Sequence, residues 1–278
     1  MEQDTNKEYL KKLLDFLELR ILSNPENNWF AKDLYKVIAP ASDTKIFEIH
    51  EQCIEVIIKS QAAEFYSSFV LEDIRPQLIA DFIKMEHWRR RNNIQEFCMA
   101  LYQQIEAITN YLGADSALNL IWRNIRNAGF FVDLKMKNIQ NRGNGKSIEE
   151  CIIYDAKNFG KELNELVAMD KFKAILFLIV YKTYVDWNNK VLFNNDFNTG
   201  YNIYMVRNLN HRGNIVDENN NDRVSNILDS PTYAMCSLLG FYARFVSSIN
   251  KNYPISKVLI EFSEICCTQN IAHDKFRY

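Results

Sequence analysis

Glycine and proline are scarce in this chain, which has 8 glycines and 5 prolines in 278 residues. Average usage would supply about two to three times as many of these turn formers. All-β sandwiches and parallel α/β folds need many turns that contain glycine or proline, so the composition argues against both classes. It favours long helices joined by loops rich in asparagine and aspartate.

Long apolar runs are also lacking. The most apolar stretch, Ala174–Tyr181, holds about eight residues, whereas a membrane-spanning helix needs about 20. The N-terminal segment MEQDTNKEYL is polar and acidic, unlike a signal peptide. We therefore expect a cytoplasmic protein without a transmembrane helix.

Residues for metal chemistry are few and scattered. The six cysteines show no CxxC spacing, and only four histidines are present. Paired CxxC motifs or clustered histidines are typical of structural zinc sites. We therefore expect reduced thiols, no metal site and no cofactor.

Apolar residues spaced three and four apart predict a succession of helices. The expected ranges are 7–22, 29–38, 45–58, 75–84 with extension as far as 91, 93–112, 117–126, 148–168, 171–192, 201–211, 231–249 and 255–267. The helix over 171–192 is apolar nearly all round its middle, which predicts a central buried position. Residues 130–134 are expected to be extended, and 138–147 and 194–200 to be loops.

These elements predict an all-α fold, a multi-helix bundle. We place the bundle in residues 86–278, with a loop insertion near 127–148. Residues 1–85 form an additional helical N-terminal region in this prediction.

One cluster of positive charge stands out in a chain of net charge −2 and pI near 6.1. The acidic balance excludes a generally polybasic nucleic-acid coat but not a local basic cleft. The segment EHWRRRNN places Arg89, Arg90 and Arg91 beside Trp88. These side chains could bind a phosphate backbone and stack a base. The alternative is an ordinary solvated helix turn.

The segment YMVRNLNHRGN, residues 204–214, carries the second cluster. On a helix, Arg207 and His211 share one face, with Asn208 beside them. Arginine pairs with phosphate in bidentate fashion, and histidine exchanges a proton near neutral pH. The alternative is a polar helix end, where the helix dipole favours basic groups.

This segment resembles the signature of HEPN domains, all-helical modules found in RNases, toxins and antiviral effectors. Their motif is an arginine, often followed by asparagine, and then a histidine after four to six intervening residues. The matching stretch here is Arg207-Asn208-Leu209-Asn210-His211-Arg212-Gly213. An upstream amphipathic helix with an internal Glu106, and the apolar helices on either side of the motif, fit the same pattern. Three residues separate Arg207 from His211, one fewer than is usual in the family.

The resemblance implies a metal-independent endoribonuclease that cleaves single-stranded RNA, of the kind used in CRISPR-linked or abortive-infection antiviral defence. In that role His211 is the general acid or base, Arg207 stabilises charge on the phosphate, and Asn208 orients the reacting groups. Arg212, with the arginines at 89–91, would contact the RNA. The family also implies a homodimer, or a partner chain that carries a second motif.

A different class of function remains open at this point. A non-catalytic HEPN-like scaffold subunit would hold RNA or another protein without cleaving it. The short spacing between arginine and histidine and the acidic pI favour this alternative.

Overall fold

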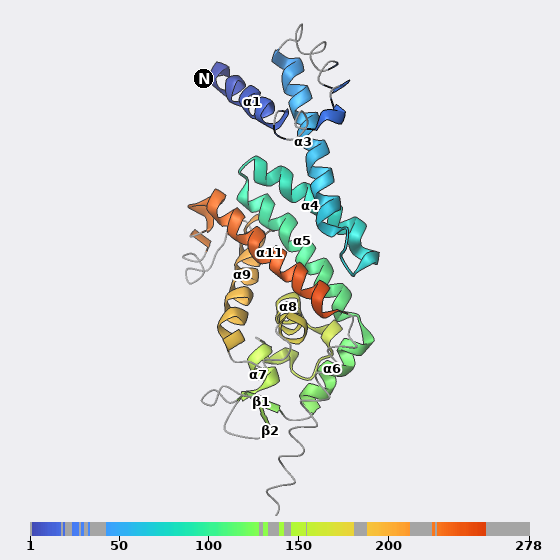
Figure 1. The fold of residues 1–278 in the computed structure, drawn as a ribbon. Coiled ribbons are helices and arrows are strands. Elements are labelled where there is room, and N and C mark those ends of the chain that lie inside the picture. Colours follow the sequence, from blue (N-terminus) through green and yellow to red (C-terminus); the bar gives the residue numbers. More distant parts are fainter. Residues whose placement is uncertain are drawn as a thin grey trace, which may run out of the picture. The chain divides into compact units, whose positions relative to one another are not determined.

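The computed structural model describes residues 2–17, 19, 24–27, 29–30, 33, 43–127, 130–132, 139–141, 146–153, 155–180, 188–211, 224–225 and 227–253. These residues are mainly helical, which confirms the predicted all-α multi-helix bundle (Figure 1). The chain divides into two compact units, Met1–Glu64 and Phe65–Tyr278.

The first unit contains α1 (Glu2–Phe16), the short 3-10 turn η2 (Pro25–Asn27) and most of α3 (Asp43–Tyr66). Tyr9 of α1 packs edge-on against two rings of α3, those of Phe47 and His50, at centroid distances of 6.0 and 5.2 Å. This pair of helices is the additional N-terminal helical region. Most of the predicted helix over 29–38 lies outside the described residues.

The second unit is the helical bundle. Its helices are α4 (Arg75–Arg90), α5 (Ile94–Gly113), α6 (Ser116–Asn127), α7 (Ile148–Ile152), α8 (Ala168–Ile175), α9 (Asn188–His211) and α11 (Pro231–Asn252). Short 3-10 turns lie at η3 (Glu72–Ile74), η4 (Ala156–Asn158) and η5 (Leu163–Glu165). Helix α5 packs against α4, α8, α9 and α11 and so lies at the centre of the bundle.

The division between the units does not coincide with the predicted boundary at residue 85. That boundary falls inside α4, which packs most extensively against α5. Leu78, Phe82 and Met85 of α4 are buried. Because α4 contributes these residues to the bundle core, the second unit begins at Phe65.

Local signals explain where the central helices begin. Pro76 lies in the first turn of α4, where its missing N–H has no helical partner to lose. Asn93 caps α5, since its side-chain oxygen accepts a hydrogen bond of 3.2 Å from the Glu96 amide. Gly113, the predicted C-cap, is instead the last residue of α5, and Ala114 is the cap. A Cβ at Gly113 would come within 2.9 Å of the Lys171 side chain, so the glycine allows a close approach.

The predicted single helix over 148–168 is wrong. Helix α7 ends at Ile152, and two 3-10 turns follow it. Asp155 caps the first by accepting a hydrogen bond from the Lys157 amide at 3.0 Å. Glu162 and Glu165 form a reciprocal capping box around the second. These caps accept hydrogen bonds from the backbone amides at the start of each short turn, so the chain forms separate turns in place of one continuous helix.

The predicted loop over 138–147 contains two short strands. Strands β1 (Phe130–Val132), β2 (Ile139–Asn141) and β3 (Lys146–Ser147) form an antiparallel sheet in the order β2-β1-β3. Phe131 pairs with Gln140 on one side and with Ser147 on the other. The extended piece predicted at 130–134 is confirmed for β1.

The predicted loop over 194–200 is helical, because α9 already begins at Asn188. Asparagine and glycine disfavour helix interiors, but here Phe193 and Gly200 are buried in the bundle. Gly200 faces the ring of Phe172 so closely that a Cβ would lie 2.3 Å from it. Tertiary packing therefore overrides the local preference for a loop.

The predicted buried helix over 171–192 begins as α8 and continues as a π-helical turn, Leu176–Val180. Its residues Ala174–Ile179 are buried, as predicted. The side-chain amide of Asn252 in α11 donates a hydrogen bond of 2.8 Å to the main-chain carbonyl of Ile179 in this turn. Residues 181–187 and the predicted helix over 255–267 lie outside the described residues.

Across the described part of the chain, each helix is too short or too polar to span a lipid bilayer.

Candidate functional site

The predicted catalytic motif lies at the C-terminal end of α9. Ile203, Val206 and Leu209 are buried and hold this part of the helix against the bundle. Arg207 and Asn208 lie between them and are half-buried. His211 is the last residue of α9. The side chain of His211 and all of Arg212 lie outside the described part of the structure.

Arg207 is held by two contacts. Its Nη1 donates a hydrogen bond of 3.0 Å to Oδ1 of Asn208. Its guanidinium carbon lies 5.4 Å from the ring centroid of Tyr102 in α5, a cation–π contact. Burial raises the pKa of the Tyr102 hydroxyl, so the ring remains neutral beneath the cation. Together these contacts fix the position of the guanidinium without neutralising it.

Among the described residues, Arg207 differs from the other half-buried arginines because it has no carboxylate as an ion-pair partner. Those have acidic partners: Arg75 with Glu72 at 3.4 Å, Arg89 with Glu86 at 2.7 Å, and Arg126 with Glu162 at 3.1 Å. Within the same described residues, no carboxylate lies within ion-pair distance of Arg207. A partly desolvated charge without a counter-ion is unfavourable until an anion binds.

The arginine cluster at the end of α4 separates into two kinds of residue. Arg89 chelates the carboxylate of Glu86 through hydrogen bonds of 2.9, 3.0 and 2.7 Å, and the Glu86 residue is only 4% exposed. This pairing neutralises Arg89. Arg91 is exposed and lies over the ring of Trp88 at 5.5 Å from its centroid, and Arg90 is also exposed. Arg91 is therefore better placed than Arg89 to contact a phosphate backbone.

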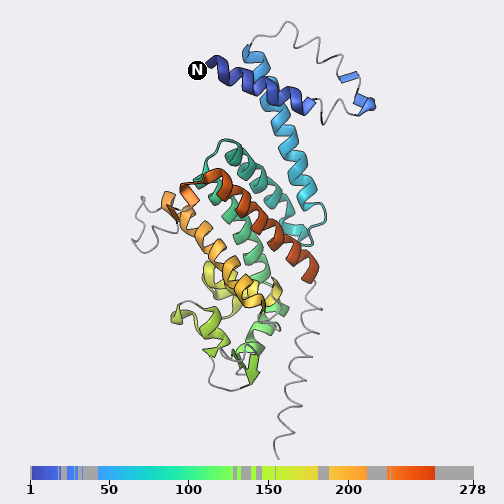
Figure 2. The same cartoon turned by 60° about the vertical axis from the view of Figure 1, so that its left-hand side comes forward.

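The two clusters lie at the same end of the bundle. Figures 1 and 2 both place the end of α9, the start of α11 and the turn between α4 and α5 together at this end. Thr232, in the first turn of α11, donates a hydrogen bond of 3.3 Å to Oδ1 of Asn92, which lies in the turn between α4 and α5. The structure thus brings the predicted RNA-binding segment and the predicted catalytic segment to one end of the second unit.

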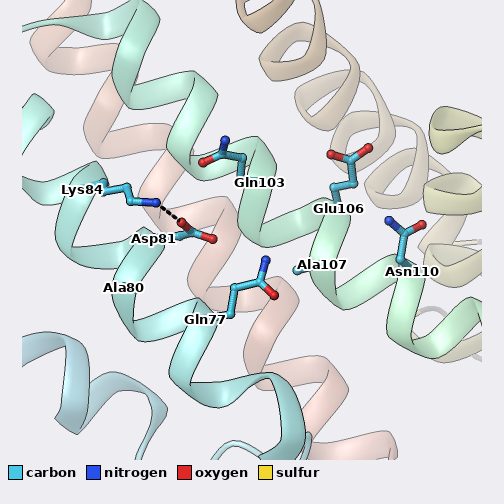
Figure 3. Close-up of a pocket in the computed structure, with 8 residues that line it drawn as sticks. All are labelled: Gln77, Ala80, Asp81, Lys84, Gln103, Glu106, Ala107 and Asn110. Atoms are coloured by element: carbon cyan, nitrogen blue, oxygen red, sulfur yellow. Dashed lines mark hydrogen bonds and ion pairs between the residues drawn. The ribbon is translucent and has the colours of Figure 1, made fainter.

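A polar groove of about 430 Å³ lies between α4 and α5 (Figure 3). Its lining residues are Gln77, Ala80, Asp81, Lys84, Gln103, Glu106, Ala107 and Asn110. Asp81 is buried and bonded to the Lys84 amine at 2.8 Å. Glu106, noted in the sequence, supplies a second carboxylate. With two carboxylates and one amine, the groove suits neutral or cationic polar groups better than phosphate.

Tyr102 and its aromatic neighbours were missed from the sequence. Phe197, Tyr201 and Tyr204 repeat at intervals of four and three, which is a helical signal. The signal was hidden because residues 194–200 read as a loop. The contact of Tyr102 with Arg207 joins helices that are distant in the chain, so no local pattern indicates it.

Metal chemistry has no prepared site in the residues that the structure describes, since no group of three or more His, Cys, Asp or Glu side chains gathers there.

Comparison of the chain with models of known protein families, with curated protein sequences and with solved structures found no match.

Proposed function

We propose that this protein binds single-stranded RNA at the end of the bundle where α9 terminates, and cleaves it there as a metal-independent, HEPN-like endoribonuclease. The observation that carries the proposal is the half-buried Arg207, positioned by Asn208 and Tyr102 and without a carboxylate partner in the described residues. A phosphate matches a planar guanidinium, since two of its oxygens can accept parallel hydrogen bonds from it. The exposed Arg91 supports the proposal, since it adds positive charge beside Trp88 at the same end.

In this reaction the 2′-hydroxyl of the RNA attacks the adjacent phosphorus. A new bond forms between the 2′-oxygen and phosphorus, and the bond from phosphorus to the 5′-oxygen of the next nucleotide breaks. The products are a cyclic 2′,3′-phosphate and a 5′-hydroxyl. His211 takes the proton from the attacking hydroxyl or donates the proton that the leaving oxygen gains, and solvent water exchanges the other proton. Arg207 stabilises the charge that develops on the phosphate, and Asn208 holds Arg207 in place.

A second candidate function is an RNA-binding scaffold without cleavage. The scaffold is supported by the short spacing of Arg207 and His211, because α9 is helical through His211 and the helix fixes their relative orientation. Arg207 and His211 are therefore one helical turn apart, whereas one more intervening residue would rotate the histidine by about 100°. In either function the family resemblance favours a homodimer or a HEPN-containing partner.

The test is incubation of labelled single-stranded RNA with the full chain in EDTA. We expect cleavage by the wild type and a loss of at least about a hundredfold for His211→Ala, because proton transfer alone contributes on the order of 10²–10⁴ in rate. Arg207→Ala should weaken both RNA binding and cleavage. Arg244→Ala is the matched control, because Arg244 is exposed and its ion pair with Asp196, at 3.3 Å, lies outside the motif.

The outcomes separate the two candidates. Cleavage that requires Mg²⁺ or Mn²⁺ contradicts the proposed chemistry. RNA binding that depends on Arg207 without cleavage of any RNA supports the scaffold.

A further inference from the structure

The groove between α4 and α5 contains a carboxylate that is only half engaged. The side chain of Asp81 is 7% exposed, and its Oδ1 accepts a hydrogen bond of 2.8 Å from the Lys84 amine. Its second oxygen, Oδ2, makes no hydrogen bond to any residue that the structure describes. Figure 3 shows the Asp81 carboxylate on the wall of the groove. An oxygen that has lost most of its hydration favours a ligand that donates a hydrogen bond to it.

A second carboxylate lines the groove from α5. Glu106 is half-buried, and within the described part of the chain its carboxylate forms neither a hydrogen bond nor an ion pair. The Lys171 amine, which lies nearby, donates to Oδ1 of Asn110 at 2.9 Å instead. The oxygens of Glu106 are therefore available to a ligand, as is Oδ2 of Asp81.

The other lining residues are uncharged and suit a slender, partly apolar ligand. Gln77 of α4 and Gln103 of α5 are exposed, and their amide groups have no hydrogen-bond partner among the described residues. Ala80 and Ala107 contribute only methyl groups, which a methylene chain can contact. The groove of about 430 Å³ thus combines separate acceptors with a small apolar surface.

These acceptors select an alkylammonium over other cations. A calcium ion takes about six to eight oxygen ligands, and no group of three or more metal-binding side chains gathers in the described residues. A guanidinium pairs best with both oxygens of one carboxylate, whereas Lys84 already occupies Oδ1 of Asp81. An ammonium is a compact charge that can pair with one oxygen, and the Lys84 amine makes that contact within this groove.

We propose that this groove is a binding site for a linear polyamine. One ammonium donates to Oδ2 of Asp81, and another donates to the carboxylate of Glu106. The methylene chain that joins them contacts Ala80 and Ala107. Lys84 competes with the ligand for Asp81, and its side chain is 60% exposed, so it can move into solvent. The site is separate from the proposed RNA site, because none of its residues belongs to the motif on α9.

The test is isothermal titration calorimetry of the full chain in the absence of RNA, with putrescine and butylamine as probes. The two amines have the same carbon chain, and only putrescine has a second ammonium. Glu106→Gln removes the second carboxylate, and Lys84→Met removes the competing amine. Glu8→Gln is the matched control, since Glu8 is an exposed carboxylate that pairs with Lys12 on α1, a helix that does not line the groove.

We expect the wild type to bind putrescine about fivefold more tightly than butylamine, because putrescine makes a second ion pair. Glu106→Gln should reduce the affinity for putrescine to that for butylamine and leave butylamine binding unchanged. Lys84→Met should bind both amines more tightly, by about fivefold, because Asp81 then has no internal cation. Glu8→Gln should change neither affinity. Melting temperatures of the variants show whether each remains folded, and Glu106→Gln tests the site if Lys84→Met is unstable.

Three results would overturn the polyamine site. Equal affinities of the wild type for the two amines exclude a second ammonium contact. A loss for Glu8→Gln as large as that for Glu106→Gln indicates diffuse attraction to an acidic chain. A folded wild type that binds neither amine excludes the site altogether. Since no RNA is present, each of these failures leaves the proposed endoribonuclease function untouched.

Discussion

The hydroxyl oxygens of Tyr66 and Tyr242 lie 2.6 Å apart inside the bundle, where neither residue has exposed surface. The Tyr66 hydroxyl also donates to Oε1 of Gln104 at 2.6 Å. Since one hydroxyl has one proton, Tyr242 must donate to Tyr66. The Gln104 amide nitrogen donates in turn to the Ala100 carbonyl at 3.1 Å, which fixes the orientation of the side chain. This network joins the end of α3 to α5 and α11.

The direction of these hydrogen bonds predicts that the two tyrosines respond unequally to substitution. Tyr66→Phe leaves both the Gln104 oxygen and the Tyr242 hydroxyl without a partner, and each buried orphan costs about 1–3 kcal/mol. Tyr242→Phe leaves the bond from Tyr66 to Gln104 intact and should cost about 1 kcal/mol. Urea denaturation of the two single variants and the double variant measures this difference. Equal losses of stability for the two single variants would contradict the assignment of Tyr242 as the donor to Tyr66.

The same pair predicts a loss of stability at alkaline pH. Burial raises the pKa of Tyr66 and of Tyr242 above the ordinary value of 10.0. The unfolded chain therefore releases these protons first, so the stabilisation is complete below pH 10 and decreases as pH rises above it. The free energy of unfolding of Tyr242→Phe should decline less steeply with pH than that of the wild type. The two slopes should differ by up to about 1.4 kcal/mol per pH unit. Denaturation between about pH 9 and pH 11 tests this, and parallel curves would contradict it.

Arg89 and Arg91 should separate fold stability from RNA binding. Arg89→Ala leaves Glu86 buried without its cation, so it should destabilise the bundle by about 3 kcal/mol or more. Arg91→Ala should leave the melting temperature nearly unchanged and reduce the salt dependence of RNA binding, since one phosphate contact fewer is made. Thermal melts and binding titrations at several salt concentrations give both quantities. A stable Arg89→Ala variant with impaired RNA binding would reverse these roles.

Two helical glycines provide a test of the packing of α9. A methyl group at Gly200 would lie 2.3 Å from the buried Phe172 ring, so Gly200→Ala should destabilise by about 1–3 kcal/mol. At Gly240 of α11 the nearest atom, Nη1 of Arg244, is 3.8 Å away. Gly240→Ala should therefore stabilise by about 0.5–1 kcal/mol through helix propensity. Opposite signs in urea denaturation confirm the close approach, and a stable Gly200→Ala variant would exclude it.

Helices with a clear apolar face were predictable. The spacing of Ile94, Phe97, Leu101, Ile105 and Ile108 predicted α5 almost to its ends, and these residues are buried as the pattern requires. The start of α9 was not predictable, because residues 194–200 are locally poor helix formers. Their helical state depends on burial against Phe172, a residue of another helix.

The candidate site was predictable only as far as it is local. Arg207 and Asn208 are neighbours in sequence, and the motif itself indicated them. Glu86 precedes Arg89 by three residues, a spacing that allows an ion pair on a helix, yet only the structure shows that the carboxylate is buried. The cation–π contact between Arg207 and Tyr102 required the packing of α5 against α9.

The π-helical turn at Leu176–Val180 determines how the bundle tolerates the loss or gain of one residue at this point in the chain. A π-helical turn closes its hydrogen bonds over one residue more than an α-helical turn, so it accommodates an inserted residue without unwinding the helix. Removing one residue from this turn would let α8 continue as a regular helix without rotating the residues that follow the turn. The Ile179 carbonyl lies inside the turn, so its hydrogen bond with the amide of Asn252 is the contact that the change would alter. A homologue one residue shorter at this point should therefore keep the packing beyond the turn.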